Sequence, residues 1–154
     1  KFDDTFIVDS KDYNEVTDLL QETNAQIAEN LTNKEAMKSS IYFIESRLER
    51  DKKRSELISH LNDIINNQLT SDEIRNEALN LKMDMVSSTE KEVLIENMII
   101  AKGFNDAIVY LSDGSINVIV NSETLVEEDV AKIVDIIKRE TDASMDDITI
   151  MSKQ

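Results

Sequence analysis

The apolar pattern changes its period several times within residues 89–151, and this stretch organises the rest of the chain. Apolar residues at helical spacing predict a helix through residues 93–101, and Gly103 stands where a left-handed residue commonly follows a helix. Thr89 and Glu92 have the spacing of a capping box, in which each side chain accepts a hydrogen bond from the other residue's backbone N–H. The pattern therefore predicts that this helix begins at Thr89.

Two β-branched runs and a second helix follow. Residues 107–111 and 116–120 predict strands, and Asp113-Gly114 between them supplies the positive φ angles of a tight hairpin. Residues 125–140 carry one apolar stripe at helical spacing, and residues 146–151 predict a short third strand. The predicted fold class is α+β, an α-β-β-α-β sandwich with two helices on one face of a three-stranded sheet.

Alternation along the predicted strands assigns their side chains to two faces. The face with Val109, Val118 and Ile150 should meet the helices. The opposite face is half apolar and holds Ile108, Tyr110, Asn117, Ile119, Thr149 and Met151. Either the N-terminal helices fold back over this face, or it is a surface for a partner, since contiguous exposed apolar patches tend to be binding sites.

The N-terminal part lacks the usual helix breakers, because the chain has no proline and both glycines lie further along. We expect an N-terminal helical region over residues 1–88 and the sandwich domain over residues 89–154. Within the helical region, residues 1–31 predict an acidic spacer with a marginal helix, and residues 71–86 predict a further helix. A long helix over residues 32–69 should start at a second capping box, Thr32 to Glu35.

The apolar stripe of the long helix is interrupted. Its first part has spacings of four, three and four at Met37, Ile41, Ile44 and Leu48. Residues 49–55 interrupt the apolar spacing, and the stripe starts again after them. A break between two helices would explain the gap, but a continuous exposed helix is favoured because nothing in the gap terminates one.

The formal net charge of −15 disfavours several classes of partner. A field of this sign repels phosphate backbones and anionic lipids, so it disfavours nucleic-acid binding and polybasic membrane docking, and it suits a basic partner. Cysteine is absent, which removes disulfide, zinc-thiolate and cysteine-nucleophile chemistry. The chain begins with Lys, which suggests an excised fragment, so a missing leader or anchor says nothing about the full-length protein.

Residues 31–69 are the one basic island in this acidic chain, with seven Lys and Arg against six Asp and Glu. Arg47, Arg50, Lys53 and Arg54 lie within about two helical turns. They form either a solvated helix face or a surface that receives the acidic side of a neighbouring subunit.

Few residues are suited to catalysis. His60 is the single histidine and sits beside a predicted helix stripe, and no nucleophile-elbow sequence occurs. Two isolated glycines exclude a phosphate-cradling loop, and the acidic clusters lack the spacing of a calcium loop. We therefore predict no catalytic, cofactor-binding or metal-ligating residues. A non-catalytic docking or oligomerising module is favoured over an enzyme or small-ligand binder with scattered carboxylates, since so small a sheet encloses little volume.

With these residues laid out, the chain from about Tyr42 onward resembles the stage III sporulation protein AH family of endospore-forming bacteria. The ordered set of matching segments carries the resemblance: Arg47-Leu48-Glu49, Leu61-Asn62, the Gly103-Phe104-Asn105-Asp106-Ala107 stretch, Ile116-Asn117-Val118-Ile119-Val120, and the Lys132-Ile133-Val134 helix. The α-β-β-α-β unit also resembles the ring-building motif of secretion-system and flagellar basal-body proteins, whose copies pack into large rings.

The resemblance implies a non-enzymatic structural component of a sporulation channel or zipper complex. Family members are held in the mother-cell membrane by one N-terminal transmembrane helix, which is absent from this sequence. Their remaining part lies in the space between mother cell and forespore and binds the forespore membrane protein stage II sporulation protein Q (SpoIIQ). Self-association and contacts with other stage III A proteins are implied as well, without a cofactor. A generic extracytoplasmic adaptor, or a ring component of another secretion-like apparatus, is the alternative.

We hypothesise that two surfaces make the partner or self contacts. One is the outer sheet face, with Ile108, Tyr110, Asn117 and Ile119. The other is the basic helix, with Arg47, Arg50 and Arg54. The motivation is apolar residues on the outer side of an alternating pattern and an isolated positive charge.

Overall fold

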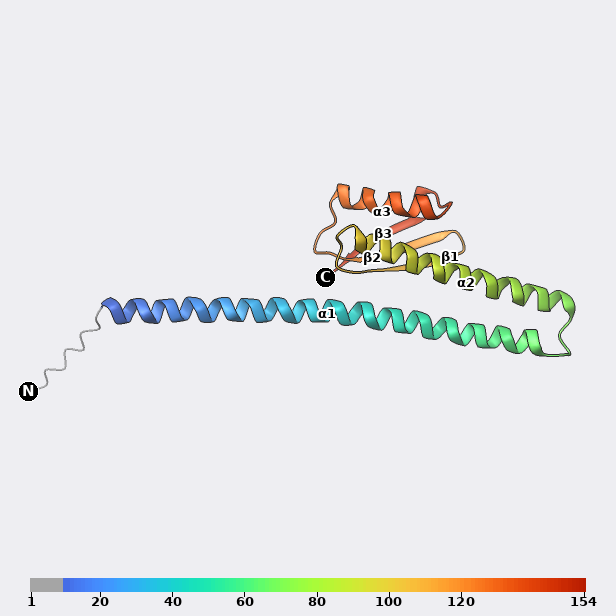
Figure 1. Cartoon of the computed structure of the whole chain (residues 1–154), viewed down its shortest axis with the longest axis horizontal. Helices are drawn as coiled ribbons and strands as arrows, with labels where there is room; N and C mark the ends of the chain where they lie inside the picture. The colour runs from blue at the N-terminus through green and yellow to red at the C-terminus, as the bar shows by residue number, and fades with distance from the viewer. Residues whose placement is uncertain (1–9) are drawn as a thin grey trace, which may run out of the picture. The chain divides into compact units, whose positions relative to one another are not determined.

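A computed structural model of the chain describes residues 10–154, with side chains from residue 14 onward. Figure 1 shows the order of its elements: α1 (Ser10–Asn66), α2 (Asp72–Ala101), β1 (Ala107–Ser112), β2 (Ser115–Asn121), α3 (Glu127–Glu140), a 3-10 turn (Met145–Asp147) and β3 (Ile148–Lys153). The chain divides into two units, Lys1–Lys38 and Ser39–Gln154, and each is described by itself below.

The first unit contains the N-terminal part of α1. Every side chain from residue 14 to residue 38 is exposed. The Thr32 hydroxyl donates to the carbonyl oxygen of Ala28, four residues earlier (2.9 Å), as a mid-helix threonine does. The predicted helix start at Thr32 is therefore wrong, because one helix runs through the predicted junction at residues 31–32. Residues 1–9 of the predicted spacer lie outside the described residues.

The second unit begins with an antiparallel pair of helices, the later part of α1 and α2, which lie side by side (Figure 1). The helix is continuous through residues 49–55, which confirms the continuous interpretation of the gap in the stripe. After Asn66 the chain turns, and Arg75 holds the turn by donating to the carbonyl oxygens of Ile65 (3.0 Å) and Asn67 (3.1 Å). Ser71 then caps α2 by accepting from the N–H of Ile74 (3.3 Å).

Helix α2 is longer than the sequence pattern indicates. It joins the predicted helix over 71–86 with the one expected to begin at Thr89, so the predicted helix start there is wrong. The Thr89 hydroxyl donates to the carbonyl oxygen of Met85 (2.8 Å), and Glu92 is fully buried instead of capping a helix. The predicted division at residues 88–89 falls inside α2. That residues 89–154 fold as a separate domain stays a prediction.

The sheet has the strand order β1-β2-β3. Strand β1 pairs with β2 in antiparallel orientation, and β2 pairs with β3 in parallel orientation. One face of the sheet packs against α2 and α3. The buried residues there form the main core: Ile95, Ile99, Ala107, Val109, Ile116, Val118, Val120, Ile133, Ile136 and Ile137. The predicted α+β class is confirmed, with the predicted order of helices and strands from α2 to β3.

The two glycines stand where the backbone needs a positive φ angle. Gly103 (φ 110°) follows the last turn of α2, as predicted, and Gly114 (φ 79°) lies in the turn between β1 and β2. Asp113 does not share the positive φ, so the hairpin has one left-handed residue and not the two of a type I′ turn.

Candidate functional site

The outer edge of β1 is closed by side chains from the two helices. Arg47 donates to the carbonyl oxygen of Ala107 (2.6 Å), and Arg50 donates to that of Val109 (2.8 Å). The N–H of Val109 donates to Glu96 (3.2 Å), and a carboxylate oxygen of Glu92 accepts from the N–H of Leu111 (2.8 Å). Backbone groups that an edge strand normally leaves free are thus satisfied within the chain.

The same side chains neutralise one another and form what we call the Arg–Glu network: Arg47, Arg50, Arg54, Glu92, Glu96 and Asp106. Arg50 pairs with Glu96 (2.9 Å), and Arg47 pairs with Asp106 (2.5 Å). Arg54 makes a two-pronged pair with Glu92. Glu92, Glu96 and Arg50 are 0%, 3% and 7% exposed. Buried charges of this kind persist only when they are paired and hydrogen-bonded.

Interactions within the network raise the pKa of two of its arginines, Arg47 and Arg50. Burial alone lowers the pKa of Arg50, but its hydrogen bond with Glu96 and the charges of Glu96, Glu92 and Asp51 raise that pKa overall. The pKa of Arg47 is raised chiefly by its hydrogen bond with Asp106.

The structure therefore gives the three arginines of the predicted basic surface an intramolecular role. Their role toward a partner stays a prediction. Sequence reasoning missed the acidic half of the network, because Glu92 fitted a capping box. The signal that could have found it is a pair of glutamates one helical turn apart, Glu92 and Glu96, bracketing Ile95 on the stripe that is buried.

The outer face of the sheet changes from covered to open across the strands. Ile108 pairs with Ile119, which pairs with Met151, so these three side chains form one row. Ile108 is fully buried, Ile119 is partly buried and Met151 is 48% exposed. Phe43 of α1 is also fully buried without belonging to the main core. Coverage by α1 thus reaches β1 and fades over β2 and β3.

Tyr110 lies at the border between these regions. It lines a hollow of about 370 Å³ with α1 residues that include Ser46 and Arg50. Burial raises the pKa of the Tyr110 hydroxyl, and hydrogen bonding with Ser46 opposes this. Further along the border, Lys153 places its ammonium group 5.1 Å from the centre of the Tyr42 ring, within cation–π distance.

Beyond this border lies what we call the open sheet face: Asn117, Ile119, Thr149 and Met151. The structure brings the predicted residues Asn117 and Ile119 together there and places Tyr110 beside them. Of the predicted sheet-face residues, Ile108 is the one withdrawn from the surface. The first interpretation of this face, that a helix folds back over it, holds at β1, where Ile108 is fully buried. That the less covered part over β2 and β3 is a surface for a partner stays a prediction.

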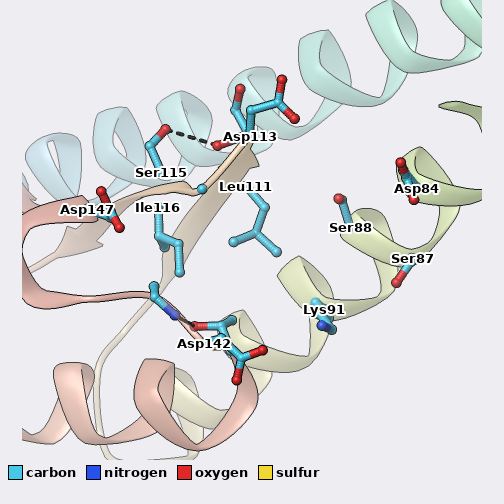
Figure 2. A pocket seen from close by; sticks show the side chains of 14 residues that line it. Asp84, Ser87, Ser88, Lys91, Leu111, Asp113, Ser115, Ile116, Asp142 and Asp147 are labelled. Atoms are coloured by element: carbon cyan, nitrogen blue, oxygen red, sulfur yellow. Dashed lines mark hydrogen bonds between the residues drawn. The ribbon is translucent and has the colours of Figure 1, made fainter.

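A second hollow, of about 430 Å³, lies between α2, the β1–β2 turn and the segment before β3 (Figure 2). It is lined by Asp84, Asp113, Asp142 and Asp147, with Lys91 as the single cation of the lining. The Ser115 hydroxyl donates to the carbonyl oxygen of Ser112 (3.1 Å) and not to a base. At the edge of this hollow the Ser144 hydroxyl donates to a carboxylate oxygen of Asp147 (2.9 Å).

Within residues 10–154, no three His, Asp or Glu side chains are grouped so that they could hold a metal ion. Nor does any helix among these residues have the length and apolarity needed to cross a membrane. His60 is exposed on α1.

Comparison with known proteins gives the family. The model of the SpoIIIAH-like protein family matches residues 4–150. The chain belongs to the SpoIIIAH-like family. The match begins well before Tyr42, where the sequence resemblance was expected to start. A comparison with curated proteins gives no match.

A solved structure supports the fold. It is described as "Structure of the SpoIIQ-SpoIIIAH pore forming complex", and a chain in it matches with a TM-score of 0.62 and 23% identity. The match covers 72% of this chain and 97% of that chain. At this identity the likeness shows a shared fold, which agrees with the sheet and helices described above.

Proposed function

We propose that this SpoIIIAH-like chain is a non-catalytic structural component of a sporulation complex and that it binds a SpoIIQ-type ectodomain. Family membership supports the sporulation role, and the structurally similar chain comes from a complex with SpoIIQ. The family resemblance supports an N-terminal anchor in the mother-cell membrane, a position in the intermembrane space, and association with itself and with other stage III A proteins.

The observation that carries the binding proposal is the uneven covering of the outer sheet face. In one row of side chains, Ile108 is fully buried under α1 while Met151 at the far edge is 48% exposed. An exposed apolar patch costs solubility, and such patches mark interaction sites on soluble domains. The open sheet face is therefore the surface on which we place the partner.

Electrostatics favour this surface over the basic helix. Arg50 and Arg54 already face buried carboxylates, so few of their donors are left for an acidic partner. The open sheet face instead offers apolar side chains beside the amide of Asn117 and the hydroxyl of Thr149, a mixture typical of interface cores with polar rims.

Calorimetry with a purified SpoIIQ-type ectodomain tests the proposal. We expect the unmodified chain to bind and the double variant Ile119→Asp with Met151→Asp to bind at least about tenfold more weakly, because charges would be buried unpaired. The matched control is Val126→Asp with Met145→Asp, which adds two charges at residues that are 54% and 56% exposed elsewhere.

The outcomes separate the alternatives. Equal affinity of both double variants would remove the open sheet face from the proposal. No binding by the unmodified chain would favour the generic adaptor or a ring component of another apparatus. Far-ultraviolet circular dichroism and a urea titration would show whether each variant still folds.

A further inference from the structure

The exposed N-terminal part of α1 carries a repeating seam of its own. With Leu20 and Ile27 at position a of a heptad, Val16 and Met37 fall at position d. These four side chains are 52–63% exposed, as expected for a helix without a neighbour among the described residues of its unit. A periodic helix much longer than 25 residues without caps is typical of coiled coils, and α1 has 57 residues.

The charges of this segment are sorted around the helix. The carboxylates of Glu15, Asp18, Glu22 and Glu29 all fall at positions c or f, on the side away from the seam. The flanking e and g positions from residue 17 to residue 33 hold uncharged residues. In a chain of net charge −15, the seam is thus the side on which two copies could meet without carboxylates facing each other.

We propose that residues 16–37 form a parallel, in-register coiled coil with the same segment of a second copy of this chain. This coiled coil would be a surface for the self-association that is part of the proposed function, and the proposal rests on that part of it. The exposed side chains and the sorted carboxylates carry it, and neither involves the open sheet face.

The polar positions of the seam explain the register. Thr23 and Asn30 fall at position d and Lys34 falls at position a. In a parallel, in-register pair each meets its own counterpart, and single polar residues at core positions select register and oligomer state at a cost in stability. The pair should therefore be weak and depend on concentration.

Sedimentation equilibrium of the whole chain over a concentration series tests for the pair. We expect the mass to rise toward that of a dimer, and the double variant Leu20→Glu with Ile27→Glu to remain a monomer. Gln21→Glu with Thr32→Glu is the matched control, because it adds the same two charges at positions b and f; it should associate like the unmodified chain. A mass that stays monomeric for the unmodified chain, or equal association of both variants, would overturn the proposal.

Disulfide trapping tests the register, since the chain has no cysteine of its own. Thr23→Cys at position d should cross-link between copies about tenfold faster than Ala25→Cys at position f, because the pair raises the local thiol concentration. Equal rates would contradict the parallel register even if the chain self-associates.

A binding measurement keeps this proposal separate from partner binding. The Leu20→Glu with Ile27→Glu variant should bind the SpoIIQ-type ectodomain with unchanged intrinsic affinity. The Ile119→Asp with Met151→Asp variant should lose that binding and keep the Thr23→Cys cross-link. Loss of both properties in either variant would contradict the assignment of two separate surfaces.

Discussion

The two edge strands of the sheet, β1 and β3, differ in how far other parts of the chain cover them. At β1, the outward backbone groups of Val109 are bonded to Arg50 and Glu96, and α1 covers the strand's outer face. At β3, Met151 is 48% exposed and the strand is exposed or half-buried along its length. Both strands lie beside the same β2, so position in the sheet alone does not explain the difference.

Edge strands left open invite pairing with other chains, and native proteins commonly block them with charges or cover them. Here a buried network of paired charges blocks the β1 edge. The β1 edge is thus used for intramolecular contacts. That the β3 side contacts another molecule is part of the proposed function.

The largest loss of stability is expected when the Arg–Glu network is broken at Glu96. This buried carboxylate pairs with both Arg47 and Arg50. Glu96→Ala should lower the free energy of unfolding by about 3–5 kcal/mol, because it leaves the Arg50 charge buried without its partner. A urea titration measures the change. Glu49→Ala is the control, since its pair with Lys53 is exposed, and it should leave the midpoint nearly unchanged. Similar midpoints for both variants would show that the network does not hold the β1 edge.

Substitutions along the row Ile108, Ile119 and Met151 should lower the free energy of unfolding by amounts that decrease in that order. Replacing Ile108 with Ala should cost about 2–5 kcal/mol, as for a fully buried isoleucine. The same change at Ile119 should cost less, and at Met151 about 0.5 kcal/mol or less, since surface changes are mild. Thermal or urea unfolding of the three variants measures the gradient. A flat series would mean that the outer face is covered evenly.

Within the Arg–Glu network, the smallest effect is expected at its open end. Arg47→Ala should cost about 1 kcal/mol, since the side chain of Asp106 is 21% exposed and water can replace part of the lost contact. Glu96, which also pairs with Arg47 at 3.5 Å, keeps its closer pair with Arg50. The urea midpoint should move less than for Arg50→Ala, whose partner Glu96 has a side chain that is 4% exposed. The reverse order would contradict the ranking by burial.

The sequence predicts the sandwich well because its signals are local. The β-branched runs on either side of Gly114 and the stripe of α3 point to elements that the structure contains. The helix starts at Thr32 and Thr89 are wrong for one physical reason. A threonine with a glutamate three residues later can also occur inside a helix, where the hydroxyl donates to the carbonyl oxygen four residues back.

The site is less predictable because it depends on contacts between distant residues. Alternation places Ile108 and Ile119 on one face of the sheet, but it does not say which strands of that face α1 covers. Arg50 and Glu96 are 46 residues apart, and each has a plausible local explanation in the sequence. Their pairing follows from the way α1 and α2 turn back on each other, which the loop around Asn67 does not specify by itself.

Hydrogen–deuterium exchange of the chain with and without a SpoIIQ-type ectodomain tests the central claim most directly. We predict that the partner slows exchange of amides in β3 and the adjoining part of β2. The Val109 and Leu111 amides, already bonded to Glu96 and Glu92, should exchange slowly in both states. Protection gained along the β1 edge, with β3 unchanged, would contradict the account.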